Sequence, residues 1–282
     1  MSSLHARLAE ARHRFERAGI TPDEAAIDAE VLVRHTLGWD RATLLMRGNE
    51  APPAGFDGRF AELVRRRCGR EPVAMIVGER EFWGLAFEVT SDVLVPRPET
   101  EFVVEAALEL AAAGEVRRIV DVGTGSGCIA VALAVALPGV EVVATDVSPA
   151  ALAVAARNAA RHGVQARIAF VHGPLLEGVE GRADLIVSNP PYVATAEAPT
   201  LPPEVLMFEP HGALFGGDDG LDVIRRLLQT AADHLAPCGR LVVEFGFGQA
   251  AAVSGLAAAA GWRLVAMRQD LKQIPRVVVL GR

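Results

Sequence analysis

The sequence predicts an α/β protein: a seven-stranded sheet with helices on both faces, preceded by a small helical bundle and a linking β-hairpin. Three observations support this fold class. The first seventy or so residues carry helical periodicity and helix caps. Between residues 79 and 90, the apolar residues are spaced as in β-strands. From about residue 100 onward, runs rich in Val, Ile and Leu alternate with helical segments, which is typical of a sheet covered on both faces.

Composition indicates a folded chain with no affinity for nucleic acid in general. Of 282 residues, 51% are hydrophobic and 22% charged, so a core can form and extensive disorder is excluded. The formal net charge is -7, and residues 1–78 hold 12 arginines against 11 acidic residues. This balance offers no general attraction for a phosphate backbone, so no direct nucleic-acid binding is expected.

Three scattered cysteines, Cys68, Cys128 and Cys238, predict neither a disulfide framework nor a metal site, and fit a reducing cytoplasm. The amino-terminal residues lack the apolar core of a signal peptide. The uncharged run from Val122 to Val140 approaches membrane-spanning length, but its glycines predict a buried strand, a turn and a helix instead. No membrane association is expected.

The amino-terminal helices are predicted from their caps. Thr21, followed by Pro22 and by Glu24 three residues on, starts a helix that Gly38 can end. We expect this helix to bury Ala26, Ile27, Val31 and Leu32. Asp40 is expected to cap a short helix through Leu45, and Phe60, Leu63 and Val64 mark another that stops near Gly69.

The spacing of the apolar residues changes from helical to strand-like around residues 79–90, where these residues and Gly84 predict a hairpin. A proline-rich stretch, Val95–Glu101, follows, and Thr100 is expected to start a helix. Strands are predicted near 118–122, 141–145, 167–171, 184–188, 240–245, 262–267 and 276–280, with helices such as Pro149–His162 and Leu221–Leu235 between them. The expected divisions are a helical domain at 1–78, a hairpin and linker at 79–98, and the sheet domain at 99–282.

A glycine-rich turn follows the first strand of the predicted sheet. Its residues are Gly123, Thr124, Gly125, Ser126 and Gly127. Such a turn lets a ligand approach the backbone, and the next helix offers free N–H groups. The dinucleotide fingerprint Gly-x-Gly-x-x-Gly requires its third glycine one residue later, where Cys128 stands, so a dehydrogenase is disfavoured.

Asp146 ends the next strand, at a position where a carboxylate can accept hydrogen bonds from both hydroxyls of a ribose. A cap on the helix that begins at Pro149 is the simpler interpretation, and both can hold. With the glycine turn upstream, we expect Asp146 to bind a ribose.

The segment Asn189-Pro190-Pro191-Tyr192 follows a further apolar strand, and its two prolines make the loop stiff. Methylation of an amide or amino nitrogen requires hydrogen-bond acceptors that orient the nitrogen lone pair. The Asn189 side-chain oxygen and the Pro190 carbonyl suit this role, and the Tyr192 ring can stack on a planar group. A rigid turn with a core tyrosine is the alternative.

With these motifs, the chain resembles the S-adenosylmethionine-dependent N5-glutamine and N6-adenine methyltransferases, and in particular the PrmC/HemK family of peptide chain release factor glutamine methyltransferases. Further similar segments are Gly78–Gly84, Val95–Glu101, Phe208–Pro210, Gly216–Asp222 and Gln269–Leu271. The resemblance covers nearly the whole chain. It implies a Rossmann-like methyltransferase sheet and S-adenosylmethionine as cofactor, with S-adenosylhomocysteine as product. It also implies a cytoplasmic enzyme that methylates the Gly-Gly-Gln glutamine of release factors in translation termination.

The resemblance also implies residue roles. Gly123 to Gly127, Asp146 and Asn189 would bind the cofactor. Asn189, Pro190 and Tyr192 would act in catalysis and, with Pro191, would bind the substrate amide. Arg97 and Glu99 would lie near the mouth of the site with Glu101, and a salt-bridged linker is their alternative. The helical domain and the hairpin would hold the release factor, while Phe82 and Trp83 are expected in the hairpin core.

Two positions depart from the family pattern. His172-Gly173-Pro174 stands where the family has an acidic residue near the adenine, so the resemblance assigns no adenine contact here, and Met75 replaces an aromatic residue. Alternative functions are a glutamine methyltransferase of a ribosomal protein, an N6-adenine nucleic-acid methyltransferase, and a cofactor-binding scaffold without activity. The intact Asn189–Tyr192 loop argues against the scaffold.

Overall fold

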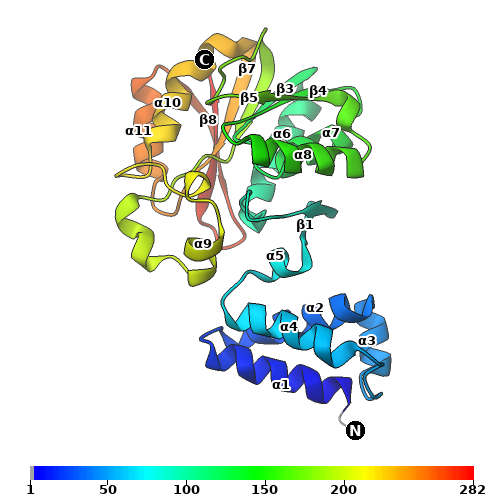
Figure 1. Ribbon diagram of the computed structural model, residues 1–282. Coiled ribbons are helices and arrows are strands. Elements are labelled where there is room, and N and C mark those ends of the chain that lie inside the picture. Colours follow the sequence, from blue (N-terminus) through cyan, green and yellow to red (C-terminus); the bar gives the residue numbers. More distant parts are fainter. Residues whose placement is uncertain (1–2) are drawn as a thin grey trace. The chain divides into compact units, whose positions relative to one another are not determined.

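The computed structural model describes residues 3–282, and the chain divides into two compact units (Figure 1). The smaller unit contains the residues up to Gly78 together with Pro202–Phe208. The larger unit contains Glu79–Leu201 and Glu209–Arg282. The polypeptide therefore passes between the units three times.

The smaller unit is helical. Its helices are α1 (Leu4–Arg17), α2 (Pro22–Leu37), α3 (Arg41–Arg47), α4 (Phe56–Cys68), α5 (Val73–Val77) and α9 (Pro203–Phe208). The predicted caps of α2 and α3 are confirmed. The Thr21 hydroxyl accepts from the Glu24 N–H and donates to the Glu24 carboxylate, Gly38 ends α2 at φ 66°, and Asp40 accepts from the Thr43 N–H.

The buried face of α2 differs from the expectation. Of the four residues predicted to be buried, only Leu32 is, and Ile27 is 63% exposed. The buried residues are Ala25, Ala29, Leu32, Val33 and Thr36. Their spacing of three and four residues places them on one side of the helix, and Ile27 lies two residues, or about 200°, away from Ala25.

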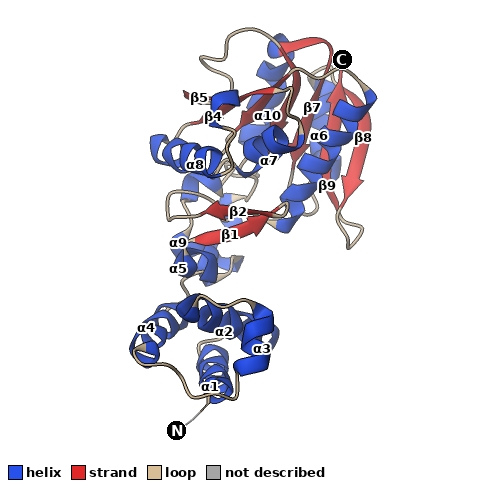
Figure 2. Cartoon of the chain, turned by 90° about the vertical axis from the view of Figure 1, so that its right-hand side faces the viewer, coloured by secondary structure: helices blue, strands red, loops and turns tan. Residues whose placement is uncertain are grey.

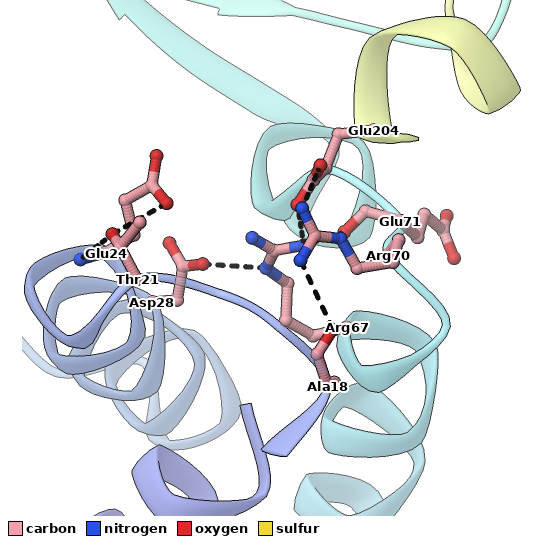
Figure 3. Close-up of polar contacts among 8 residues, drawn as sticks. All are labelled: Ala18, Thr21, Glu24, Asp28, Arg67, Arg70, Glu71 and Glu204. Carbon is pink, nitrogen blue, oxygen red and sulfur yellow. Dashed lines mark hydrogen bonds and ion pairs between the residues drawn. The ribbon is translucent and has the colours of Figure 1, made fainter. Parts of the chain in front are cut away.

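Helix α9 belongs to the smaller unit through charged contacts (Figure 3). The guanidinium of Arg67, which is nearly buried, binds Asp28 at 2.7 Å and Glu204 of α9 at 2.9 Å. Arg70 binds the other Glu204 oxygen at 2.7 Å. Burial raises the pKa of Glu204, but a backbone hydrogen bond and the two arginines outweigh it, so the net pKa is lowered. Glu204 is therefore held in its ionised form.

The larger unit is built on a mixed sheet, drawn as red arrows in Figure 2. Its strands are β3 (Arg118–Val122), β4 (Glu141–Asp146), β5 (Ile168–His172), β6 (Ala183–Ser188), β7 (Leu235–Glu244), β8 (Arg263–Gln269) and β9 (Pro275–Gly281). The order is β5-β4-β3-β6-β7-β9-β8. The first five strands in this order are parallel, and β9 pairs antiparallel with both β7 and β8.

Helices cover both faces of this sheet, as the apolar strands predicted. Helices α6 (Glu101–Ala113), α7 (Cys128–Ala136) and α8 (Pro149–Arg161) pack on one face, where Ile119, Leu185 and Val187 point. Helices α10 (Asp222–Thr230) and α11 (Ala250–Ala259) pack on the other, against Val120 and Ile186. Short 3-10 turns complete the unit: η1 (Pro98–Thr100), η2 (Gln165–Arg167), η3 (Thr195–Thr200), η4 (His211–Ala213) and η5 (Ala231–His234).

The hairpin β1 (Glu79–Phe82) and β2 (Leu85–Glu88) forms as predicted, with Trp83 and Gly84 both at positive φ in a two-residue turn. Phe82 and Phe87 are buried in the same cluster as α6 and α7. Within residues 3–282, no helix combines the length and apolar character needed to cross a bilayer. The run from Val122 to Val140 instead forms the strand end, turn and helix that its glycines predicted.

Candidate functional site

The site lies at the carboxyl edge of the parallel strands, where ligands bind in open α/β sheets. The residues that follow β3, β4, β5 and β6 line a pocket of about 270 Å³ in the larger unit. Its lining includes four sets of residues: the turn Gly123–Ser126, the segment Asp146–Ser148, the segment Gly173–Leu175, and Asn189–Pro191. The predicted glycine turn, Asp146 and the Asn-Pro-Pro loop therefore surround one cavity.

The three glycines of the turn have different surroundings. Gly123 and Gly125 have φ of 72° and 53°, and a side chain added at either would meet nothing within 4 Å. Open space at these two positions fits a ligand that approaches the backbone closely. Gly127, at φ 80°, does not line the pocket, and an added Cβ would lie 2.9 Å from Ala155 Cβ of α8. Gly127 therefore permits helix packing.

A buried carboxylate holds this turn in place. Asp121, at 0% exposure, accepts hydrogen bonds from the Thr124 hydroxyl at 2.6 Å and from the Ala130 N–H at 3.2 Å, both to Oδ2. Burial raises its pKa to about 7, although the Thr124 hydrogen bond opposes this shift. Its Oδ1 atom is buried without a hydrogen-bond partner among residues 3–282.

Asp146 lies at the pocket wall and is fixed by the backbone. Its Oδ2 accepts from the Gly125 N–H and its Oδ1 from the Ser148 N–H, both at 2.9 Å. Asp146 does not cap α8, because Ser148 is the N-cap and accepts from the Ala151 N–H. Each carboxylate oxygen keeps a second lone pair, so Asp146 can still accept from two hydroxyl groups.

In the loop after β6, one end of the Asn189 amide is bound to another residue of the pocket wall, Thr100. Asn189 Nδ2 donates to the Thr100 hydroxyl at 2.9 Å, which leaves Oδ1 as the atom available to accept from another group. Asn189, Pro190 and Pro191 line the pocket. Tyr192 does not: it packs against the cluster on the α10 and α11 face, and its hydroxyl donates to Glu244 at 3.4 Å.

Arg97 and Glu99 occupy different environments. Arg97 lines the pocket and binds both oxygens of Glu209, at 2.6 and 2.7 Å. Burial raises the pKa of Glu209, and the Arg97 charge opposes this rise. Glu99 is absent from the pocket lining, and Glu101 accepts from the Trp83 N–H. Arg97 is therefore both salt-bridged and at the site.

Two polar residues near the loop were not identified as site residues from the sequence. Thr100, expected to start a helix, makes no side-chain cap and instead binds Asn189. Glu244 ends β7 and is 1% exposed. A signal for Glu244 was present, since it is an acidic residue at the end of an apolar strand, as Asp146 is. Pro174, which departs from the family pattern, lines the pocket with Gly173 and Leu175.

Comparison with known proteins assigns the family. The amino-terminal helices match the PrmC N-terminal domain over residues 7–78, and residues 100–205 match the methyltransferase small domain. A release factor glutamine methyltransferase of Cereibacter sphaeroides is 47% identical over 94% of this chain and 93% of its own length. The chain belongs to the release factor glutamine methyltransferase family. Another member, from Xylella fastidiosa, is 45% identical over 99% of this chain and 98% of its own length.

Solved structures of other methyltransferases share the fold. A ribosomal protein L11 methylase from Lactobacillus delbrueckii subsp. bulgaricus has a TM-score of 0.51 and 21% identity, covering 69% of this chain and 83% of that one. The N-terminal domain of human METTL16, solved in complex with SAH, has a TM-score of 0.51 and 18% identity, covering 79% and 83%. At these identities the likeness establishes the fold.

As a member of this family, the chain is an S-adenosylmethionine-dependent methyltransferase. The pocket is compatible with that cofactor. It offers open space beside Gly123 and Gly125 and a fixed carboxylate with free lone pairs, and it needs no cradle for a pyrophosphate, which this cofactor lacks.

Proposed function

We propose that this chain transfers a methyl group from S-adenosylmethionine to the N5 side-chain amide nitrogen of the glutamine in the Gly-Gly-Gln motif of peptide chain release factors. S-adenosylhomocysteine is the second product. The full-length relatives named release factor glutamine methyltransferase support the substrate. The proposed chemistry rests on one observation: at the wall of the pocket, Asn189 Nδ2 donates to the Thr100 hydroxyl, which leaves the Asn189 Oδ1 atom free to accept.

The reaction requires the chain to orient a poor nucleophile. The lone pair of an amide nitrogen is delocalised, so two acceptors must hold its NH2 group in a geometry that directs the lone pair at the methyl carbon. Asn189 Oδ1 and the Pro190 carbonyl are those acceptors in this proposal. When bound, S-adenosylmethionine supplies an electrophilic methyl group on a sulfonium. The amide proton leaves to solvent after transfer, so the chain needs no strong general base.

The other site residues position the two substrates. Gly123, Thr124, Gly125 and Ser126 would lie against the cofactor, and Asp146 would accept from its ribose hydroxyls. Gly127 would support the turn through α8. Pro191 would stiffen the loop. We place Tyr192 beside the loop as a support for its conformation, because its hydroxyl is directed to Glu244. Arg97 would face the substrate while bound to Glu209, with Glu99 close in sequence.

The protein partner is also part of the proposal. The helical unit and the β1–β2 hairpin would recognise the release factor in the cytoplasm. A ribosomal protein is the second candidate substrate, and a nucleic-acid adenine is the third. The chain's charge of -7 and its near-neutral amino-terminal helices do not favour the nucleic acid.

The test is to incubate the purified chain with unmethylated release factor and methyl-labelled S-adenosylmethionine and to locate the label by peptide mass mapping. We expect label on the Gly-Gly-Gln glutamine and none on a Gln→Ala release factor. Normal cofactor binding without label at this glutamine would reject the release factor as substrate and favour the ribosomal protein.

Two variants test the assigned roles. Asn189→Ala should abolish methyl transfer while the dissociation constant for S-adenosylmethionine stays within a few fold, because the Asn189 side chain is proposed to bind the amide of the substrate glutamine.

Asp146→Ala should weaken cofactor binding by about 10-fold or more, since about 1.4 kcal/mol of lost hydrogen bonding corresponds to that factor. Unchanged cofactor affinity in Asp146→Ala would remove the carboxylate from the ribose site.

A further inference from the structure

A buried carboxylate contacts Tyr192, the last residue of the Asn189–Tyr192 loop. Glu244 is 1% exposed at the end of β7. Its Oε1 accepts from the Tyr192 hydroxyl at 3.4 Å, and its Oε2 is buried without a hydrogen-bond partner among residues 3–282. A buried carboxylate oxygen without a hydrogen-bond donor lowers the stability of the fold. A donor close to Glu244 would remove this cost.

The Thr100 hydroxyl is one donor that interacts with this carboxylate. Thr100 is 2% exposed, and its oxygen accepts from Asn189 Nδ2 at 2.9 Å. The same hydroxyl interacts favourably with the ionised Glu244 carboxylate and lowers the pKa of Glu244. Thr100 therefore interacts both with the buried carboxylate and with the Asn189 amide.

The direction of these hydrogen bonds is chemically constrained. A hydroxyl has one proton, and an ionised carboxylate can only accept. If the Thr100 proton goes to Glu244, the Thr100 oxygen can only accept from Asn189. The Asn189 amide must then turn its NH2 group to Thr100 and its oxygen to the pocket.

We propose that Glu244 is a positioning residue for methyl transfer, which takes the Thr100 proton and so fixes the Asn189 amide with its oxygen directed at the substrate amide. Through Tyr192 the same carboxylate holds the end of the loop. Gln249 supports that end separately, since its amide donates to the Tyr192 carbonyl at 2.9 Å and accepts from the Gly246 N–H at 2.8 Å. This inference rests on the proposed function of Asn189.

The protonation state of Glu244 matters to this role. The pKa of Glu244 is raised to about 7, because burial, together with the Glu99 charge, outweighs the lowering by Thr100, Tyr192 and Arg276. The negative charge of Glu244 also raises the pKa of Cys128 in α7. A protonated Glu244 becomes a donor and no longer fixes the Thr100 proton. The rate of methyl transfer should therefore rise as the pH increases through about 7.

The experiment measures single-turnover methylation of release factor by the full chain and by two variants. Glu244→Gln keeps the shape but can donate to Thr100, and Thr100→Val keeps the shape but removes the hydroxyl. Each should reduce the rate by about 10- to 100-fold, as expected for a misoriented reacting group. The dissociation constant for S-adenosylmethionine should stay within about 3-fold. The double variant should be no slower than the slower single variant, because both changes break one chain of hydrogen bonds.

Two further measurements separate positioning from mere structural support. The rise in rate through about pH 7 should be present in the parent chain and absent in Glu244→Gln. Thr100→Ser, which keeps the hydroxyl, should recover most of the rate lost in Thr100→Val. Thr230→Val serves as the control within the larger unit, because the Thr230 hydroxyl donates to the Arg226 carbonyl at 3.1 Å within α10 and Thr230 does not line the pocket. That control should leave the rate and its pH profile unchanged.

The possible results distinguish a failure of the proposed function from a failure of the role proposed for Glu244. If the parent chain does not methylate release factor, the proposed function fails. If the parent is active and both single variants keep rates within about 3-fold of it, the positioning role of Glu244 is rejected. Additive losses in the double variant, or an unchanged pH profile in Glu244→Gln, would also reject it.

Discussion

Single residues in this chain show that similar sequence signals can serve different physical needs. Gly123, Gly125 and Gly127 belong to one glycine-rich turn and all have positive φ, yet the first two face open space and the third faces α8. The residue types alone could not separate these cases. The difference arises from α8, which begins more than twenty residues later in the chain.

Substitution at Gly125 and Gly127 should therefore have different effects. Gly125→Ala should cost about 1 kcal/mol of folding stability from backbone strain, and should reduce cofactor affinity because the new methyl group enters the pocket. Gly127→Ala should cost about 2–4 kcal/mol, because strain adds to a clash with Ala155. Urea unfolding with and without S-adenosylmethionine measures both quantities. Equal losses of stability in the two variants would contradict this assignment.

Asp121 predicts a pH dependence of stability. Its pKa in the folded chain is about 7, above the ordinary value of 3.8, because it is buried. The folded state therefore holds a proton that the unfolded state releases, and the contribution of this group to stability falls as pH rises from about 4 to 7. In Asp121→Asn this loss is absent. The difference in melting temperature, variant minus parent, should increase from pH 5 to pH 8; a constant difference would refute the prediction.

At the scale of elements, the sheet could be predicted closely because its strands are buried on both faces and read as continuous apolar runs. The prediction was less accurate where tertiary contacts decide the boundary. The helix expected over Leu221–Leu235 ends at Thr230, and β7 begins at Leu235 rather than near residue 240. The first residue of β7 pairs with Ala183 across an irregularity in register, and Cys238 has positive φ.

The site was predictable in part for the same reason. The glycine turn, Asp146 and Asn189 stand directly after apolar strands, and parallel strands bring their carboxyl ends to one edge. The contact of Thr100 with Asn189 spans 89 residues, and that of Tyr192 with Glu244 spans 52. No local pattern reports such contacts, and a threonine before a helix more often predicts a cap.

Helix α9 should depend on its charge cluster. Glu204→Gln removes the carboxylate that faces the nearly buried Arg67 and Arg70, and should cost about 1.5–3 kcal/mol, the range for hydrogen bonds to charged groups. Hydrogen exchange of residues 203–208 should become faster. Glu62→Gln is the matched control, because the Glu62 pair with Arg65 is largely exposed and its loss should leave the stability nearly unchanged. Similar losses in both variants would argue against a special role for the cluster.

At the scale of the whole molecule, ligand binding should act on one of the two units. Every residue that lines the pocket belongs to the larger unit. S-adenosylmethionine at 100 times its dissociation constant should stabilise that unit by about 2.7 kcal/mol, and NAD should have no effect, because the glycine spacing does not fit a dinucleotide. Thermal unfolding with each compound provides the measurement. Stabilisation by NAD would overturn the assignment of the pocket.

The three passages of the chain between the units have a consequence for recombination. Arg67 and Arg70 lie in the first 78 residues, while Glu204, the carboxylate that they share, is encoded more than 130 residues later. A chimera that takes only residues 1–78 from a relative would combine arginines from one parent with an α9 from the other. Exchange of the amino-terminal unit therefore requires two grafts, residues 1–78 and residues 202–208, and a single crossover near residue 78 divides a folding unit.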